Sequence, residues 1–121
     1  MRAQIRRGDA AAEFATDERC HIIEVANDAD DENLSIARAR VEPGVTTAWH
    51  RLDGIEERYL LISGRGRVEV GDLPPTDVGP GDVVRIPANT AQRISNTGSD
   101  QLVFYALCTP RFEAAKYINL E

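Results

Sequence analysis

The sequence predicts an all-β domain in which short antiparallel strands close into a barrel or a sandwich. Apolar residues recur with a period of two over most of the chain, as in strands that bury one face. Gly, Pro and Asn residues interrupt these runs at short intervals. No segment with helical periodicity is long enough to cross between parallel strands, so closed antiparallel sheets fit the pattern best.

The expected elements follow from this pattern in chain order. Residues 1–18 are polar and rich in alanine, and we expect them to be irregular. The acidic segment 27–33 is expected to form a loop, and only residues 111–120 have a helical character. The expected strands cover residues 20–25, 34–41, 46–52, 58–63, 66–70, 82–86, 91–95 and 101–108.

Size and charge limit the function classes. The chain has 121 residues, of which 42% are hydrophobic, so we expect one domain over residues 1–121 with a C-terminal tail from residue 109. The formal net charge is −6 and basic residues do not cluster, which argues against nucleic acid and membrane surfaces as partners. No apolar run resembles a membrane span or a secretion signal, so a cytoplasmic protein is expected.

Two strand–turn–strand segments carry the residues that indicate chemistry. In residues 44–64, His50 lies near the end of one expected strand and Glu57 at the start of the next. In a hairpin, the imidazole and the carboxylate can face the same side and form half of a site for a divalent metal. In residues 81–96, Pro87 marks the turn and Gln92 follows it.

These two segments resemble the two motifs of the cupin family. The first resembles G-x5-H-x-H-x3-4-E-x6-G, and the second resembles G-x5-P-x-G-x2-H-x3-N. The resemblance implies a cupin double-stranded β-helix, which is a jelly-roll barrel. The matching residues are Gly44, His50, Glu57 and Gly64 in the first motif, and Gly81, Pro87 and Asn96 in the second.

The departures from these motifs concern the metal ligands. In metal-binding cupins, two His and one Glu of the first motif and one His of the second bind the ion. Here Leu52 stands in place of the second His, and Gln92 in place of the second-motif His. Asn89 stands where the second motif has Gly, and Asn also tolerates a positive φ. By position, the resemblance leaves His50, Glu57 and Gln92 as the metal ligands.

Two functions remain open for this set of side chains. One imidazole, one carboxylate and one amide would bind Zn, Fe, Mn or Ni more weakly than three imidazoles and would leave positions for water or substrate. Such an open site suits a metal-dependent enzyme of the dioxygenase, isomerase or lyase type acting on a small molecule. Alternatively, the chain has no metal, and the three side chains form a hydrogen-bonded cluster in a non-catalytic small-molecule-binding protein.

Strand alternation extends the site into a pocket. If Glu57 faces the interior, so does Tyr59, and these two are the candidate catalytic residues. On the strand of His50, alternation places Thr46 and Ala48 on the same side as the imidazole. The remaining inward positions form a mostly apolar wall, which is typical of a small-molecule site. The expected substrate-binding residues are Ala48, Leu52, Leu61, Ile94, Phe104, Ala106 and Cys108.

Apolar residues also occupy outward positions on two of the expected strands. A monomer would expose them, so a homodimer that covers them is expected, in line with the pairing that is common among small cupins. These residues are Leu60, Ile62, Val103, Tyr105 and Leu107.

Overall fold

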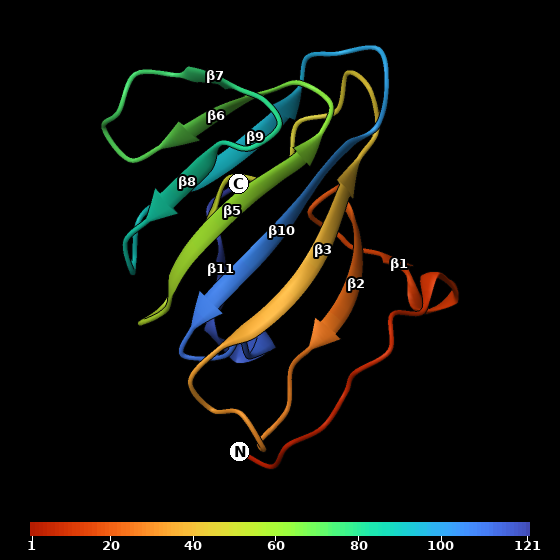
Figure 1. Cartoon of the computed structure of the whole chain (residues 1–121). Coiled ribbons are helices and arrows are strands. Elements are labelled where there is room, and N and C mark those ends of the chain that lie inside the picture. Colours follow the sequence, from red (N-terminus) through yellow and green to blue (C-terminus); the bar gives the residue numbers. More distant parts are fainter.

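Two antiparallel β-sheets face each other in the computed structural model, which describes residues 1–121 (Figure 1). One sheet has six strands in the order β1-β2-β3-β10-β5-β8, and the other has five in the order β11-β4-β9-β6-β7. This architecture confirms the predicted all-β fold. Only two short helical turns occur, and neither is long and apolar enough to cross a membrane.

Most strands lie where the alternation of the sequence predicted them. The six-stranded sheet contains β1 (Phe14–Ala15), β2 (His21–Ala26), β3 (Ser35–Val41), β10 (Leu102–Thr109), β5 (Glu56–Ser63) and β8 (Val83–Ile86). The five-stranded sheet contains β11 (Tyr117–Asn119), β4 (His50–Leu52), β9 (Gln92–Asn96), β6 (Gly66–Val70) and β7 (Thr76–Val78). The helical turns are η1 (Ala10–Ala12) and η2 (Ala114–Lys116).

The core lies between the two sheets. Strand β10 pairs with β3 on one side and β5 on the other, so Phe104 lies opposite both Ala39 and Leu61. Ile94 of β9 points into the same core from the other sheet and is fully buried. Burial of one such large aliphatic side chain contributes about 1.5–3 kcal/mol. This packing fixes the strands that carry the polar side chains of the interior.

Two turn positions show why the motif residues are needed. Gly64 has φ +88°, and a Cβ atom there would lie 2.6 Å from the carbonyl oxygen of Gln101, so no larger residue fits without a backbone shift. Asn89 has φ +64°, and its Oδ1 accepts a hydrogen bond from the Gly54 N–H at 2.9 Å. The turn before β9 is therefore joined to the turn between β4 and β5, which places Gln92 and His50 on neighbouring strands.

The prediction of one continuous strand over residues 46–52 is wrong. Only β4 is regular, and Thr46 forms an isolated bridge with Ser95. Thr47 rather than Thr46 is buried, and its hydroxyl accepts a hydrogen bond from the Ile94 N–H at 3.0 Å. The backbone of this segment changes partner, because the Thr47 N–H donates to Ile94 while the Ala48 N–H donates to Glu18. Strict alternation ends where the partner changes.

The C-terminal segment and the start of the chain also differ from expectation. After the single turn η2, residues 117–119 form β11 instead of a helix. Strand β11 pairs with β4, so Tyr117 lies opposite Leu52 and Asn119 opposite His50. The irregular segment expected over residues 1–18 contains η1 and β1, and β7 was not expected. These short strands owe their conformation to distant partners, which local periodicity does not reveal.

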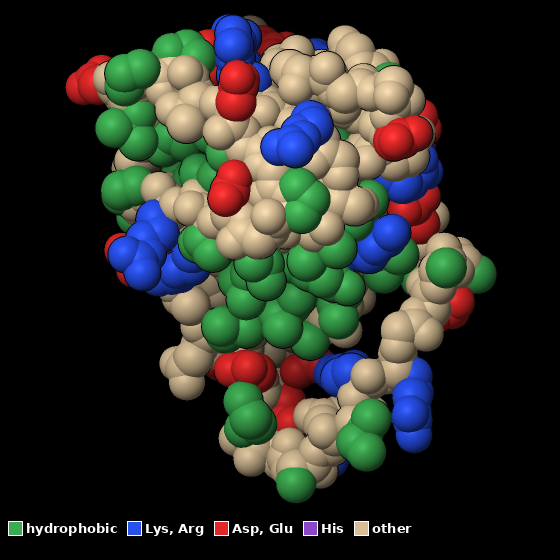
Figure 2. All heavy atoms as spheres, turned by 45° about the horizontal axis from the view of Figure 1, so that its top comes forward, with side chains coloured by type: hydrophobic (Ala, Val, Ile, Leu, Met, Phe, Trp, Pro, Cys, Tyr) green, Lys and Arg blue, Asp and Glu red, His purple; other side chains and the backbone are tan.

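Apolar side chains remain on the outside of the six-stranded sheet. Leu60 and Ile62 of β5 and Val83 of β8 are exposed, whereas Val103 is buried. Figure 2 shows hydrophobic side chains gathered on one part of the surface with basic side chains near its edges. The expected homodimer, which would cover such a surface, stays a prediction.

Candidate functional site

The candidate site lies between the two sheets. His50 of β4 and Gln92 of β9 are register partners in the five-stranded sheet. Glu57 and Tyr59 lie on β5 of the facing sheet, on the same side of the strand. All four side chains are buried. The structure thus brings the four polar residues singled out in the sequence into the barrel interior.

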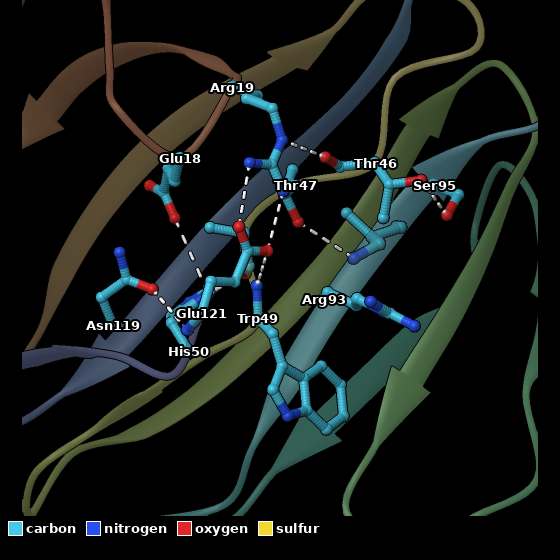
Figure 3. A network of polar contacts seen from close by, with 12 residues as sticks. Glu18, Arg19, Thr46, Thr47, Trp49, His50, Arg93, Ser95, Asn119 and Glu121 are labelled. Atoms are coloured by element: carbon cyan, nitrogen blue, oxygen red, sulfur yellow. Dashed lines mark hydrogen bonds and ion pairs between the residues drawn. The ribbon is translucent and has the colours of Figure 1, made fainter.

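The tautomer of His50 follows from its surroundings. Its Nδ1 lies 2.7 Å from the carbonyl oxygen of Ala48, which can only accept a hydrogen bond. In the neutral ring, the hydrogen is therefore on Nδ1 and the lone pair on Nε2. Glu18 Oε2 also lies 3.8 Å from Nδ1 (Figure 3). Nε2 remains available as an acceptor or as a metal ligand.

Glu57 combines burial with an unsatisfied carboxylate. Its Oε1 atom is buried and has no hydrogen-bond partner, while Oε2 lies 3.8 Å from the Cys108 sulfur. Burial raises the pKa of Glu57 to about 7, because the ion loses hydration. The Gln92 amide partly lowers this pKa, and the negative charge of Glu18 raises it. Glu57 can therefore hold or release a proton near neutral pH.

Tyr59 and Gln92 form a hydrogen-bonded pair in the barrel interior, close to Glu57. The Tyr59 hydroxyl donates to Gln92 Oε1, and the phenol ring packs on Phe104 with centroids 4.5 Å apart. Burial, followed by the nearby charge of Glu57, raises the pKa of Tyr59 well above its ordinary value. The phenol is therefore neutral, and the oxygen of Gln92 already has a donor.

Two adjacent cavities are lined by residues of the candidate site. The inner one has a volume of about 60 Å³ and is lined by His50, Glu57 and Tyr59 among others. The outer one has a volume of about 370 Å³ and lies between residues 14–24 on one side and residues 112–119 on the other. Glu57 lines both cavities. The volume of the outer cavity is that of a small-molecule pocket.

The predicted wall residues divide between the cavities and the core. Leu52, Phe104 and Ala106 line the inner cavity, and Ala106 and Cys108 line the outer one. Burial raises the pKa of the Cys108 thiol, which keeps it protonated. The other three predicted wall residues, Ala48, Leu61 and Ile94, are buried in the core and line neither cavity, and the same holds for Gln92.

Sequence reasoning did not identify four residues that line both cavities, one of which is Ile22 of β2. Glu18 lies in the segment expected to be irregular, and Phe112 and Tyr117 lie in the segment expected to be helical. The Tyr117 ring stacks on the imidazole of His50. The one local signal was the period-two spacing of Tyr117 and Asn119, which both line the outer cavity.

An ion pair holds the C-terminal segment beside the site. The guanidinium of Arg19 donates to both carboxylate oxygens of Glu121 at 3.0 and 2.8 Å, and the Trp49 N–H also donates to this carboxylate at 2.8 Å (Figure 3). The hydrogen bonds from Arg19 and then from Trp49 lower the pKa of Glu121 to about 2. The Leu120 N–H donates to the Trp49 carbonyl. The ion pair thus joins two segments that are far apart in sequence and that both contribute residues to the outer cavity.

The metal ligands implied by the motifs fit only in part. No group of three or more His, Cys, Asp or Glu side chains is placed to hold a metal ion. Two donor atoms fit such an ion, namely the Nε2 atom of His50 and the unpartnered Oε1 atom of Glu57. The Oε1 atom of Gln92 accepts one hydrogen bond from the Tyr59 hydroxyl, which leaves one lone pair for a third ligand.

A facing pair of antiparallel sheets around an interior pocket defines a double-stranded β-helix protein with a small-molecule cavity. The family model described as the Cupin domain matches residues 37–108. The chain therefore belongs to the cupin family, which confirms the resemblance seen in its motifs. No protein in a search of curated proteins matched the sequence.

Solved structures of low sequence identity share this fold. An uncharacterised protein with a double-stranded β-helix domain from Klebsiella pneumoniae superposes with a TM-score of 0.79 at 16% identity, covering 98% of this chain and 99% of that one. KdgF from Halomonas sp. superposes with a TM-score of 0.72 at 17% identity, covering 83% of this chain and 88% of that one. A predicted oxalate decarboxylase from Thermotoga maritima superposes with a TM-score of 0.71 at 20% identity, covering 81% of this chain and 90% of that one.

Proposed function

We propose that this cupin binds a small organic molecule in its interior pocket, and that Glu57 and His50 accept hydrogen bonds from it. The observation that carries the proposal is the buried Oε1 atom of Glu57, which has no partner within the protein. An unsatisfied buried polar atom costs about 1–3 kcal/mol, more if it is charged. A hydrogen-bond donor on a ligand would remove this cost, and Glu57 lines the pocket of about 370 Å³.

The acceptor character of the inner end supports the same proposal. His50 Nε2 carries a lone pair in the neutral ring, because Nδ1 faces the Ala48 carbonyl. The hydroxyl of Tyr59 is engaged by Gln92, so it does not compete for the ligand. The inner end therefore offers two free acceptors, and the apolar residues around them provide the contact area that small-molecule sites use.

A divalent metal at the same two atoms is the second candidate. The hydrogen bond between His50 Nδ1 and a backbone carbonyl favours it, because this arrangement commonly orients a metal-ligating imidazole. His50 and Glu57 would hold the ion, with Gln92 as the third ligand. A Zn, Fe, Mn or Ni ion would supply Lewis-acid or oxygen chemistry to an enzyme of the dioxygenase, isomerase or lyase type. Glu57 and Tyr59 would then act on the substrate.

Two measurements on one preparation separate the candidates. The protein is purified without chelator or polyhistidine tag, and its metal content is measured by mass spectrometry. A metal-free sample is then screened against a library of small metabolites by ligand-observed NMR, with His50→Ala, Glu57→Gln and the distant surface variant Asp72→Asn as controls. Ligands that bind the wild type and Asp72→Asn, but not the two site variants, would support the proposal.

The opposite results are equally clear. Stoichiometric metal that is lost in both His50→Ala and Glu57→Gln would favour the metal candidate. A metal-free protein whose ligands bind equally well to all three variants would contradict a binding role for the interior pocket.

A further inference from the structure

The charges that line the pocket are all of one sign. Four carboxylates, those of Asp17, Glu18, Glu24 and Glu57, line the outer cavity, and no Lys, Arg or His side chain lines it. His50, at the inner end, is the one basic side chain in the two cavities. Its Nδ1 already lies against a carbonyl oxygen. The pocket therefore presents negative charge to whatever enters it.

These carboxylates have no Arg or Lys partner, unlike several carboxylates on the surface. On the surface, Glu13 pairs with Arg40 at 2.6 Å and Glu121 with Arg19 at 2.8 Å. None of the four pocket carboxylates forms an ion pair with an Arg or Lys side chain, although the chain contains 14 such residues. No Arg or Lys side chain therefore neutralises the pocket carboxylates, and Glu18 has only the imidazole of His50 at 3.8 Å.

An independent observation points to a ligand at the same place. Glu57 is only 8% exposed, it lines both cavities, and its Oε1 atom has no hydrogen-bond partner. The Thr16 and Tyr59 hydroxyls are engaged elsewhere, because Thr16 donates to the Cys20 carbonyl and Tyr59 donates to Gln92. The unmet requirement at the junction of the two cavities is therefore for a donor, and a positively charged one fits best.

We propose that the pocket takes a small organic cation, a protonated amine with a compact apolar body, whose ammonium group lies between Glu57 and Glu18. This inference rests on the proposed small-molecule pocket and names its ligand class. An ammonium group carries only hydrogen-bond donors, which matches acceptors such as Glu57 Oε1 and His50 Nε2.

The apolar walls fit the rest of such a ligand. Phe112 and Tyr117 line both cavities and place aromatic rings beside Glu18 and Glu57, where a cation gains from the ring faces. Ile22 lines both cavities and offers contact to an apolar body. A carboxylate or a phosphate would instead face four like charges with no guanidinium or ammonium group to receive it, so anionic ligands are excluded from the class.

The test uses three probes with the same apolar body and different head groups, namely 2-phenylethylamine, 2-phenylethanol and 3-phenylpropionate. Each is titrated into the full-length, metal-free protein near neutral pH, and binding is followed by calorimetry and by NMR chemical shifts of pocket residues. We expect the amine to bind about tenfold or more tightly than the alcohol and the carboxylate not to bind measurably. Glu18→Gln and Glu57→Gln should each weaken amine binding about tenfold, whereas Asp72→Asn should not change it.

Other outcomes would overturn the inference in distinguishable ways. Binding of the alcohol or the carboxylate at least as tight as that of the amine, lost in Glu57→Gln, would leave the small-molecule pocket intact but refute a cationic ligand. Binding of Zn²⁺ or Mn²⁺ alone, with no response to any organic probe, would refute the inference and favour the metal candidate. No binding of the amine at millimolar concentration would also refute the inference. The metabolite screen would then show whether the pocket binds any small molecule.

Discussion

The ring of Tyr117 stacks on the imidazole of His50, with centroids 4.9 Å apart and the two planes inclined by 21°. The two residues are 67 positions apart in sequence, and the pairing of β11 with β4 brings them together. Tyr117 therefore covers one face of the imidazole and at the same time lines both cavities. The C-terminal segment is part of the candidate site and not merely an appendage to the barrel.

Replacement of Tyr117 by alanine should destabilise the C-terminal segment that lines the pocket. The change removes a half-buried ring and its stacking contact with His50, so we expect the free energy of unfolding to fall by about 1–3 kcal/mol. Urea denaturation would measure this loss, and the NMR signals of His50 would report the changed ring environment. Tyr117→Phe is the matched control, because it removes only the hydroxyl and keeps the ring that stacks on His50. Equal destabilisation by both variants would contradict a role for the ring.

Glu57→Gln should stabilise the metal-free protein at alkaline pH. The folded-state pKa of Glu57 is raised to about 7, whereas its ordinary value is 4.5, so the folded protein holds the proton more tightly than the unfolded chain. Stability therefore falls as pH rises from about 4.5 to 7, and the full cost remains above 7. That cost is about 3 kcal/mol at most, and the neutral glutamine avoids it.

The measurement is urea denaturation of wild type and Glu57→Gln at pH 5 and pH 8, after removal of metal ions. The advantage of the variant should be present at pH 8 and small at pH 5. An equal difference at both pH values would show that Glu57 does not titrate in this range.

Acid should release the C-terminal segment before it unfolds the barrel. The pKa of Glu121 is lowered to about 2 by Arg19 and Trp49, so this carboxylate stabilises the fold above pH 4.5 and its contribution is lost as pH falls from 4.5 towards 2. The protection of the amides of residues 117–120 against hydrogen exchange, relative to an unstructured chain at the same pH, should fall over this interval, while that of β10 stays high. In Glu121→Gln the same amides should exchange fast at every pH, and slow exchange in that variant would contradict the assigned role of the ion pair.

Tyr59 and Gln92 should behave as an energetically coupled pair. Tyr59→Phe leaves the buried oxygen of Gln92 without its donor, which should lower the free energy of unfolding by about 1–3 kcal/mol. The double variant Tyr59→Phe/Gln92→Leu removes both partners and should be less destabilised than the sum of the single variants. Denaturation curves of the four proteins give the coupling free energy, and a value near zero would show that the hydrogen bond does not contribute.

The alternation of the sequence was sufficient to predict the sheets and the inward direction of Glu57 and Tyr59. Alternation is a local property of a strand, and β5 is long and regular enough to express it. The motif spacing also indicated that His50 would lie near Gln92, and the two are register partners. Residues 44–96 alone were therefore sufficient to predict the fold and the four polar side chains of the site.

The same reasoning could not find Glu18 and Tyr117. Each lies in a short segment whose conformation depends on a partner far away in the sequence, since the carbonyl of Glu18 accepts the Ala48 N–H and Tyr117 pairs with Leu52. Both segments are too short for an alternating pattern of apolar residues to be distinguished from chance. The acidic character of the pocket escaped notice for the same reason, because its carboxylates come from separate parts of the chain.

The ion pair between Arg19 and Glu121 joins the segment 14–24 to the C-terminal segment, and residues of both segments line the outer cavity. We expect the strength of this ion pair to set how readily the two walls of the cavity separate. A change at either residue would therefore alter the residence time of a guest without altering any atom that touches it.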